Sequence, residues 1–452
     1  MSSRYDVVVV GAGIAGSYLA YLLSRLGIDV LLVDMKPFER VGDKPCGDAI
    51  GKHHFDELGV EYPKGNELEG IVRGIDVYSP YEDVKYRVLG DGFEVNRIAF
   101  TQRFVRKAVD NGVTYLEKTH ALRPIISRGK VVGVTLWRRG QGSWNVNSSL
   151  LVDATGLSRA IIRHLPSEWP VSEKLDAKDI NIAYREVRVL RKPIEEPEIL
   201  RIYINKNVAP GGYWWLFPYS LSDNVVNVGL GVQGGMGYPN PKDLLYEHVL
   251  KREVFEGSKV VEAGGAPLPT RRALASLVWH GIAAVGDAAF TANPIHGGGK
   301  GSAMISSYCL AKAIERALKT GELTLENLWW ANICYNERYG VKQAVLDLFR
   351  RFLQRLSNED LEYGMKRRLI REEDLNVLSL KGDLELSVVE KAMRLLAGLG
   401  RPSLLLRLRS VAKFMDRIKS YYRSYPEKPE MIYEWIRGLN RIYEEFEEKA
   451  LK

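Results

Sequence analysis

Three glycines near the start of the chain have the spacing needed to bind a diphosphate. Gly11, Gly13 and Gly16 follow a run of four valines and open a helical pattern. In such a turn the first glycine permits the bend, the second lets backbone approach a pyrophosphate, and the third lets helix and strand pack closely. Asp34 ends the next apolar strand, where it can accept a ribose hydroxyl. The unit predicts a dinucleotide site whose further contacts include the neighbouring residues Ala15 and Met35.

A single thiol follows this unit and could take part in proton transfer. Cys46 lies in a short loop between Pro45 and the pair Gly47 and Asp48, and we predict that all four approach the cofactor. An ordinary thiol has a pKa near 8.5, so it can supply a proton at neutral pH. We therefore predict a catalytic role for Cys46, with simple packing as the alternative, since free cysteine is most often a small buried hydrophobe. His53 is a candidate contact for a polar head group, with a solvated surface histidine as the alternative.

Two later strands must position further cofactor contacts. One ends at Asp153, and the other ends in the pair Gly286–Asp287. A glycine run then leads into a helix, and we expect its backbone N–H groups to face the cofactor at Gly298, Gly299 and Lys300. Asp287 is placed to bind a sugar-like hydroxyl.

The order of these motifs resembles FAD enzymes of the p-hydroxybenzoate hydroxylase fold, over about residues 4–320. The resemblance implies FAD, with Asp287 on the ribityl chain and the glycine run beside the flavin ring. It also implies that Arg103 faces the FAD phosphates and that backbone at Ala121 brackets the adenine. A surface arginine and a plain strand residue are the alternatives for these two positions.

An aromatic segment in the middle of the chain narrows the resemblance. Tyr213, Trp215 and Phe217 alternate, so on a strand they share one face. The segment resembles the Tyr-x-Trp-x-Phe-Pro signature of geranylgeranyl reductases, and so does the loop around Cys46. This family implies reduction of C=C bonds in polyprenyl lipids by hydride from reduced FAD plus a proton. The aromatic face would then be a wall for the hydrocarbon, with ordinary sheet core as the alternative. An external donor, NAD(P)H or ferredoxin, would supply the electrons.

Composition sets the remaining limits. The chain has 452 residues, 46% hydrophobic and 27% charged, so it is long enough for two or three folded domains. Three cysteines are too few for a disulfide framework. The net charge of +8 favours anionic partners, but no motif supports nucleic-acid binding, and no spacing indicates a metal site. Glycines interrupt the longest charge-free stretch, so we expect no transmembrane segment and a cytoplasmic protein. The composition also leans toward a thermophile.

The C-terminal region raises two open questions. Residues 401–423 form a basic amphipathic pattern, with seven basic side chains and one acidic side chain. Such a helix can lie on an anionic membrane, or it can pack its apolar stripe on the protein. Cys309 and Cys334 flank a predicted loop between two helices at about equal distances, so they could form a disulfide or remain buried thiols.

We therefore predict an α/β protein with a Rossmann-like FAD domain, a mixed-sheet substrate domain and a helical C-terminal region. The FAD domain comprises residues 1–50, 95–160 and 265–320, the substrate domain 51–94 and 161–264, and the helical region 321–452. Two rival functions share this fold. One is a flavin monooxygenase or halogenase, the halogenases having a related Trp-x-Trp-x-Ile-Pro motif, and the other is a non-catalytic prenyl-binding escort.

Overall fold

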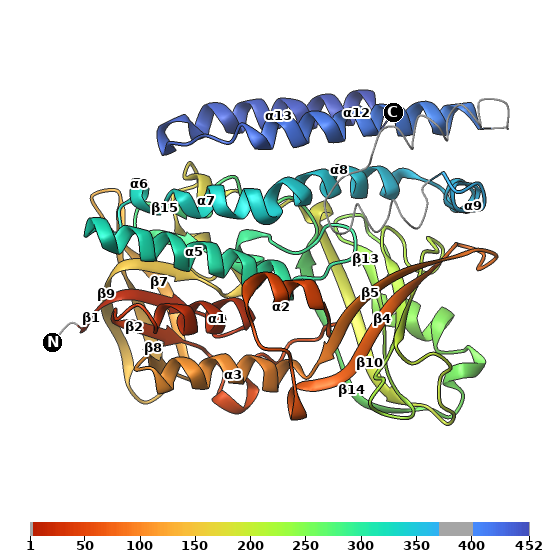
Figure 1. Ribbon diagram of the computed structural model, residues 1–452, viewed down its shortest axis with the longest axis horizontal. Coiled ribbons are helices and arrows are strands. Elements are labelled where there is room, and N and C mark those ends of the chain that lie inside the picture. The colour runs from red at the N-terminus through yellow and green to blue at the C-terminus, as the bar shows by residue number, and fades with distance from the viewer. Residues whose placement is uncertain (1–2, 370–400, 452) are drawn as a thin grey trace.

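Two sheets lie next to each other in the computed structural model, which describes residues 3–369 and 401–451 (Figure 1). In the first sheet the strand order is β15–β16–β9–β1–β2–β6, and β8 links β7 to β9. Its strands are β1 (Ser3–Val10), β2 (Val30–Val33), β6 (Thr114–Leu116), β7 (Thr119–Ser127), β8 (Lys130–Arg138), β9 (Gly142–Asp153), β15 (Val278–Trp279) and β16 (Ile282–Ala284).

The centre of the first sheet is parallel and fully buried. β1 pairs in parallel with both β2 and β9, and the four valines that end β1 are buried. A continuous apolar run is typical of a parallel strand that is covered on both faces. Because parallel strands share one carboxyl edge, the turns that follow β1, β2, β9 and β16 lie at the same edge of the sheet.

The second sheet has the order β14–β10–β13–β12–β11–β4–β5–β3. Its pairings are antiparallel except that of β11 with β4. Its strands are β3 (Ala49–Gly51), β4 (Leu68–Tyr78), β5 (Lys85–Val95), β10 (Ile180–Val189), β11 (Ile199–Tyr203), β12 (Tyr213–Pro218), β13 (Val225–Gln233) and β14 (Lys259–Pro269).

Helices cover the first sheet and continue outward in layers (Figure 1). α8 lies between the sheet-covering helices and an outer hairpin made by α12 and α13. The helices are α1 (Ile14–Leu23), α2 (Lys52–Leu58), α3 (Arg97–Asp110), α4 (Pro241–Leu244), α5 (Lys300–Thr320), α6 (Leu325–Leu328), α7 (Trp330–Tyr335), α8 (Val341–Arg355), α9 (Asn358–Lys366), α12 (Pro402–Arg423) and α13 (Ile432–Lys449).

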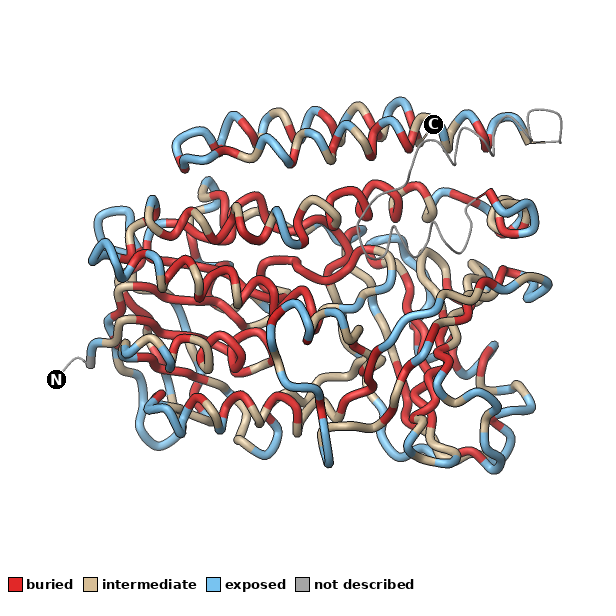
Figure 2. Tube along the Cα trace, in the orientation of Figure 1, coloured by how far each residue is buried: buried red, intermediate tan, exposed pale blue. Residues whose placement is uncertain are grey.

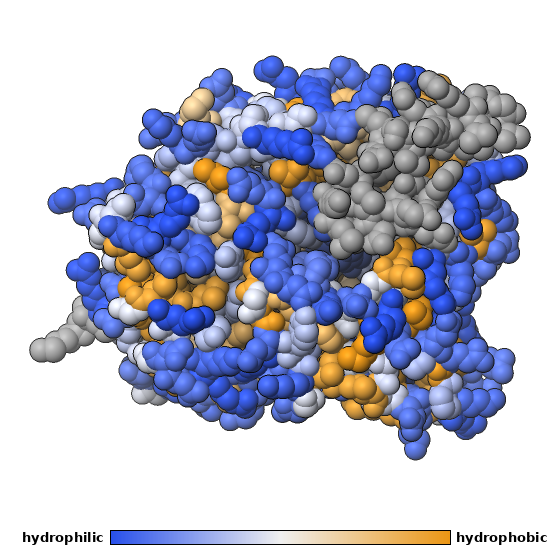
Figure 3. All heavy atoms as spheres, in the orientation of Figure 1, coloured by the Kyte–Doolittle hydropathy of each residue, from blue (hydrophilic) through white to orange (hydrophobic). Residues whose placement is uncertain are grey.

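The apolar stripe of α12 faces the interior. Its buried members are Leu404, Val411, Met415, Ile418 and Tyr422. They belong to the main core, and Figure 2 shows burial along the inner side of the hairpin. Figure 3 shows mainly hydrophilic atoms where the hairpin meets solvent. The structure therefore favours packing on the protein for this stripe, which is not free to enter a membrane. In the described ranges, no helix combines the length and apolarity needed to cross a bilayer.

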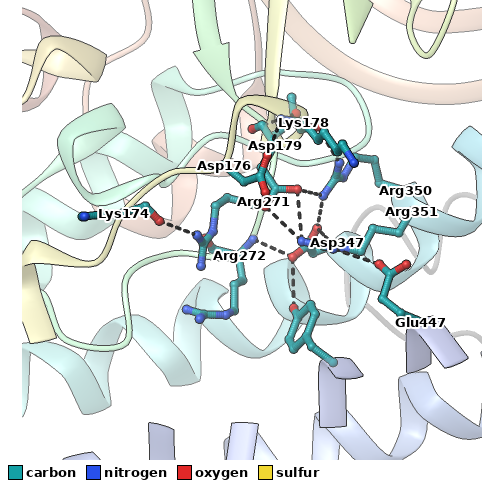
Figure 4. A network of polar contacts seen from close by, with 12 residues as sticks. Lys174, Asp176, Lys178, Asp179, Arg271, Arg272, Asp347, Arg350, Arg351 and Glu447 are labelled. Atoms are coloured by element: carbon teal, nitrogen blue, oxygen red, sulfur yellow. Dashed lines mark hydrogen bonds and ion pairs between the residues drawn. The ribbon is translucent and has the colours of Figure 1, made fainter. Parts of the chain in front are cut away.

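A buried ionic network, here called the clamp network, connects α8 to the ends of two strands (Figure 4). Asp347 accepts hydrogen bonds from the Arg350 guanidinium at 2.6 Å and from the backbone N–H of Arg272 at 3.1 Å. Asp179, just before β10, pairs with Arg350 at 2.7 Å and with Arg351 at 3.0 Å. These five residues hold the helical layer against the second sheet.

Candidate functional site

The glycine turn after β1 presents bare backbone on one side. Gly11 has a φ of +99°, and a Cβ there would lie 2.5 Å from the carbonyl oxygen of Ala154. A Cβ at Gly16 would lie 1.8 Å from the oxygen of Gly11, whereas one at Gly13 would meet no atom within 4 Å. Packing within the turn therefore requires glycine at positions 11 and 16, whereas position 13 is open. Gly13 leaves room for a ligand at the N-terminus of α1.

The acid at the end of β2 faces this turn. Asp34 accepts a hydrogen bond from the backbone N–H of Ala12 at 2.6 Å. The N–H of Thr119 donates to the carbonyl oxygen of Asp34 at 2.9 Å, so β7, which contains Ala121, begins beside the same acid. Met35 is 60% exposed. The residues predicted for the adenosine end of the cofactor therefore lie at one edge of the first sheet.

Asp287 lies across the turn from the first glycines. A Cβ at Gly286 would lie 2.9 Å from the Cβ of Ala15, which places the start of this motif against α1. The carboxylate of Asp287 pairs with Lys44 at 2.9 Å, and a Cβ at Gly299 would lie 3.4 Å from it. Burial alone would raise the pKa of Asp287, but Lys44 holds it below its ordinary value. The thiol loop, this acid and the glycine run therefore meet.

Cys46 has an ammonium group against its sulfur. Lys300, the first residue of α5, places Nζ 3.2 Å from Cys46 Sγ and 3.6 Å from Asp48 Oδ1. Burial alone would raise the pKa of the thiol, but the charge of Lys300 contributes to a net lowering of that pKa. Pro45 fixes the loop by packing against β14, where a Cβ at Gly264 would lie 2.6 Å from its ring. Sulfur and ammonium are close enough to exchange a proton.

Arg97 belongs to this site although the sequence motifs did not identify it. Burial and a nearby lysine have the larger effects on the pKa values of Cys46 and Asp287. The positive charge of Arg97 lowers both of these pKa values further. Its Nε is buried without a hydrogen-bond partner among the described residues. The structure does not bring Arg103 to this group, because Arg103 pairs with Glu67 at 2.9 Å. The available signal was position, since Arg97 opens the helix that follows β5 and a helix N-terminus favours anions.

The aromatic strand β12 has two distinct faces. Tyr213, Trp215 and Phe217 lie on one of them, in a small apolar cluster of their own. Trp214 lies on the other and stacks on Tyr203, with ring centroids 3.7 Å apart. The predicted register of the strand is confirmed, while contact of its first face with a substrate stays a prediction.

Hydrogen bonds hold the first face against the thiol loop. Trp215 Nε1 donates to Asn227 Oδ1 at 3.0 Å, and Asn227 Nδ2 donates to the carbonyl oxygen of Cys46 at 2.8 Å. A Cβ at Gly47 would lie 3.0 Å from the Phe217 ring. One at Gly229 would lie only 2.2 Å from the Trp215 indole. Both glycines are therefore needed for the aromatic side chains to lie where they do.

Histidines and a lysine gather where the glycine run approaches β12. The rings of His53 and His54 lie 4.0 Å apart, and His296 Nδ1 accepts from the N–H of Gly298 at 3.1 Å. Burial, with the charge of Lys342 next, lowers the pKa of His53 and lowers that of His296 to about 4. Burial also lowers the pKa of Lys342 to about 8. An anion beside these side chains would raise their pKa values and so favour their protonated forms.

The other two cysteines lie apart from this chemistry. Cys309 of α5 and Cys334 of α7 are joined by a disulfide, with their Cα atoms 5.6 Å apart. It ties together two helices on either side of the loop at residues 321–324. Cys46 is the remaining cysteine and is a free thiol.

Comparisons with known proteins match this chain over nearly its whole length. The geranylgeranyl reductase catalytic domain family matches residues 179–267, and the NAD(P)-binding Rossmann-like domain family matches residues 9–62. A digeranylgeranylglycerophospholipid reductase from Sulfolobus acidocaldarius is 51% identical over 445 residues, 98% of each chain. Another reductase of that name, from Methanopyrus kandleri, is 28% identical over 86% of this chain and 96% of its own.

Solved structures agree on the fold. A geranylgeranyl bacteriochlorophyll reductase-like protein from Thermoplasma acidophilum has a TM-score of 0.76 at 20% identity, covering 91% of this chain and 100% of its own. A flavin-dependent brominase has a TM-score of 0.65 at 19% identity, covering 93% and 100%. The predicted Rossmann-like fold with mixed sheets and a helical C-terminal region is confirmed. On the strength of the 51% identity over 98% of the chain, this protein belongs to the geranylgeranyl reductase family.

Proposed function

We propose that this chain is an FAD-dependent reductase that hydrogenates the C=C bonds of geranylgeranyl chains in archaeal membrane-lipid precursors. One observation carries the proposal. The aromatic face of β12, the Cys46 thiol and the glycine run before α5 adjoin one another, linked by Asn227, Lys300 and the Tyr213 hydroxyl, which donates to the carbonyl oxygen of His296 at 2.6 Å. The reductase names of the Sulfolobus and Methanopyrus relatives support the same substrate class.

The residues present fit FAD. The bare backbone at Gly13 and the unpartnered Nε of Arg97 suit its diphosphate, while Asp34 suits the ribose and Asp287 the ribityl chain. When bound and reduced, FAD supplies hydride to one carbon of the double bond. The glycine run contributes N–H groups at the start of α5, where the positive end of the helix dipole favours the negative charge of reduced flavin.

The hydrocarbon would lie along the aromatic face. Trp215 is 7% exposed and Phe217 8%, so their rings form a firm surface whose position is fixed by Asn227 and Gly229. Apolar side chains hold a polyprenyl chain through burial of its surface. They also keep water from the reacting carbons, which protects the hydride for the alkene.

Cys46 is the candidate proton donor. Its sulfur lies 3.2 Å from the Lys300 ammonium, which can return a proton to the thiolate after each transfer. Donor groups work best when their pKa lies near the working pH, and the lowered pKa of this buried thiol moves it in that direction.

An anionic head group suits the basic group made by His53, His296 and Lys342. These residues lie beside the carbonyl that the Tyr213 hydroxyl contacts, at one end of the aromatic face. A phosphate there would offset the buried charge of Lys342 and raise the pKa of His296.

Two further partners follow from the chemistry. Each turnover consumes a hydride, so an external reductant, NAD(P)H or ferredoxin, must reload the flavin. The lipid substrate and the net charge of +8 support contact with an anionic membrane surface. Solvent-facing basic side chains such as Arg409, Lys413 and Arg423 would make that contact, since the apolar stripe of α12 is buried.

Cofactor and reaction class can be tested together. The purified protein should be yellow with one FAD per chain, and Arg97→Met should retain much less flavin than the matched variant Arg103→Met. Expression in cells that make geranylgeranyl lipids should yield products heavier by two hydrogen atoms per reduced bond. Products that form only with oxygen and halide would instead support the halogenase alternative.

A further inference from the structure

A second group of buried charges lies behind the pair formed by Cys46 and Lys300, and the reaction described above does not use it. Glu94 of β5 is 0% exposed, Asp48 5% and Arg185 4%. Within the described residues, five of their side-chain atoms are buried without a hydrogen-bond partner, namely Asp48 Oδ1, Glu94 Oε1 and Oε2, and Arg185 Nε and Nη1. Buried polar groups are nearly always satisfied, so this concentration beside a reactive thiol requires a reason.

Asp48 connects Glu94 to the thiol. The Lys300 ammonium lies 3.6 Å from Asp48 Oδ1 and 3.2 Å from Cys46 Sγ, so it touches both. Val95, the residue after Glu94, donates its backbone N–H to the carbonyl oxygen of Asp48 at 3.1 Å. Sulfur, ammonium and the Asp48 carboxylate are therefore adjacent, and the charges of Asp48 and Lys300 both act on Glu94 beside them.

The fold provides space for this second carboxyl. A Cβ at Gly70 on β4 would lie 2.6 Å from Glu94 Oε2, so glycine is required for the side chain to fit. Burial, and then the charge of Asp48, raises the pKa of Glu94 well above its ordinary value. The surroundings of Glu94 therefore favour its protonated carboxyl over the carboxylate.

On its other side, Asp48 faces charged side chains that lead toward solvent. Arg185 lies 4.0 Å from Asp48 and pairs with Glu262 at 2.6 Å. The side chain of Glu262 is 56% exposed on the edge strand β14. Charged side chains therefore extend from Asp48 to the surface of β14.

We propose that Glu94 stores the proton used in each reduction and delivers it to Cys46 through Asp48 and Lys300. The S–H bond of Cys46 breaks as a C–H bond forms at the second carbon, which leaves a thiolate. Lys300 protonates the thiolate, and Glu94 restores the Lys300 proton through Asp48 and bridging solvent. The Glu94 carboxylate then takes a proton from water. Hydride and proton together add two hydrogen atoms to each double bond, so the step balances. This inference rests on the proposed function, and Glu94 is a positioning residue because it acts through Cys46.

The test compares Glu94→Gln, which keeps the shape but holds no transferable proton, with Glu94→Asp, which keeps the acid. Glu186→Gln is the matched control, because Glu186 is also buried in the second sheet but bonds to Tyr184, Tyr246 and Arg188. During repeated turnover with a geranylgeranyl lipid, Glu94→Gln should slow the steady-state rate on the order of tenfold to a hundredfold, because Lys300 and Cys46 regain their protons more slowly. Flavin content and reduction by dithionite should stay normal. The alkaline limb of the pH–rate profile should disappear, and Glu94→Asp should restore part of the rate.

Infrared spectroscopy tests the stored proton without any turnover. The wild type should show a protonated carboxyl band that shifts in D₂O and is missing from Glu94→Gln but present in Glu186→Gln. An unchanged rate and pH profile in Glu94→Gln, equal slowing in Glu186→Gln, or no such band would each overturn the proposal. A wild-type protein that shows the band but does not reduce the lipid would refute the proposed function and leave the protonated Glu94 established.

Discussion

Two buried groups of charges in this protein differ in how fully their carboxylates are paired. In the clamp network every carboxylate oxygen of Asp179 and Asp347 has a partner (Figure 4). In the group behind Cys46, here called the site cluster and made of Asp48, Glu94, Arg185 and Lys300, both oxygens of Glu94 have none among the described residues. The two groups are similarly buried.

The difference in pairing shifts the pKa values of the two carboxyl groups in opposite directions. Burial alone would raise the pKa of Asp347, but Arg351 and Arg350 hold it well below its ordinary value. Burial raises the pKa of Glu94, and the nearby charge of Asp48 raises it further. A paired carboxylate stays charged and can hold elements together, whereas an unpaired one keeps a proton that chemistry can use.

Breaking the clamp network should have the largest effect on stability. Asp347→Ala removes one of the two buried carboxylates that Arg350 and Arg351 share, which should cost about 3–5 kcal/mol of unfolding free energy. Thermal unfolding followed by circular dichroism measures this loss. Asp416→Ala on α12, the neighbouring helix of the outer hairpin, serves as the control. A shift of the same size in the control would show that the clamp network does not hold the layers.

The two faces of β12 sharpen the same contrast between structure and chemistry. Trp214→Ala should cost about 3 kcal/mol of stability, because it empties a packed position against Tyr203. Trp215→Ala should mainly slow lipid reduction while flavin content and dithionite reduction stay near normal. Unfolding curves and single-turnover rates measured on both variants separate these effects. A reversal of the pattern would assign the substrate wall to the wrong face.

Removing the ammonium from the site cluster should alter the thiol. In Lys300→Met the pKa of Cys46 should rise because burial remains and its main opposing charge is lost. Alkylation by iodoacetamide at neutral pH should then slow about tenfold, as for a shift of about 1.4 kcal/mol. Lys44→Met is the control, since Lys44 pairs with Asp287 instead. An unchanged alkylation rate in Lys300→Met would remove Lys300 from the proton path.

The most gradual effect should be on the pH dependence of stability. A carboxyl whose pKa is raised by folding contributes stability below its unfolded pKa and loses it as pH rises toward the folded value. Wild-type protein should therefore lose about 1.4 kcal/mol per pH unit in that window relative to Glu94→Gln. Denaturant unfolding from pH 4 upward measures the gap. A constant gap would mean that Glu94 is ionised in the folded protein.

Local sequence patterns predicted the parts of this molecule that depend on short-range spacing. Residues close together in sequence were enough to predict three features. These are the glycine turn with Asp34, the alternating faces of β12, and the loop that joins the helices of Cys309 and Cys334. The amphipathic pattern of α12 was also visible. The sequence did not show what covers the apolar stripe of α12, because α8 and α13 contact it only in the folded chain.

The missing parts of the site depend on long-range pairing. Arg103 and Arg97 lie on the same helix, and only the folded structure shows that Arg103 pairs with Glu67 while the Arg97 Nε has no partner among the described residues. Glu94 is one acid among 56 Asp and Glu residues, and only the loop that brings Asp48 beside it makes it part of the site. No local spacing carries that information.

The most direct test of the account is one anaerobic turnover of the reduced protein with a geranylgeranyl lipid. We expect flavin absorbance to return at the rate at which the lipid product forms. Mass spectrometry should then show one double bond reduced, with a gain of two hydrogen atoms, for each flavin reoxidised. Flavin that stays reduced in the presence of the lipid, or is reoxidised only when oxygen enters, would contradict the assignment.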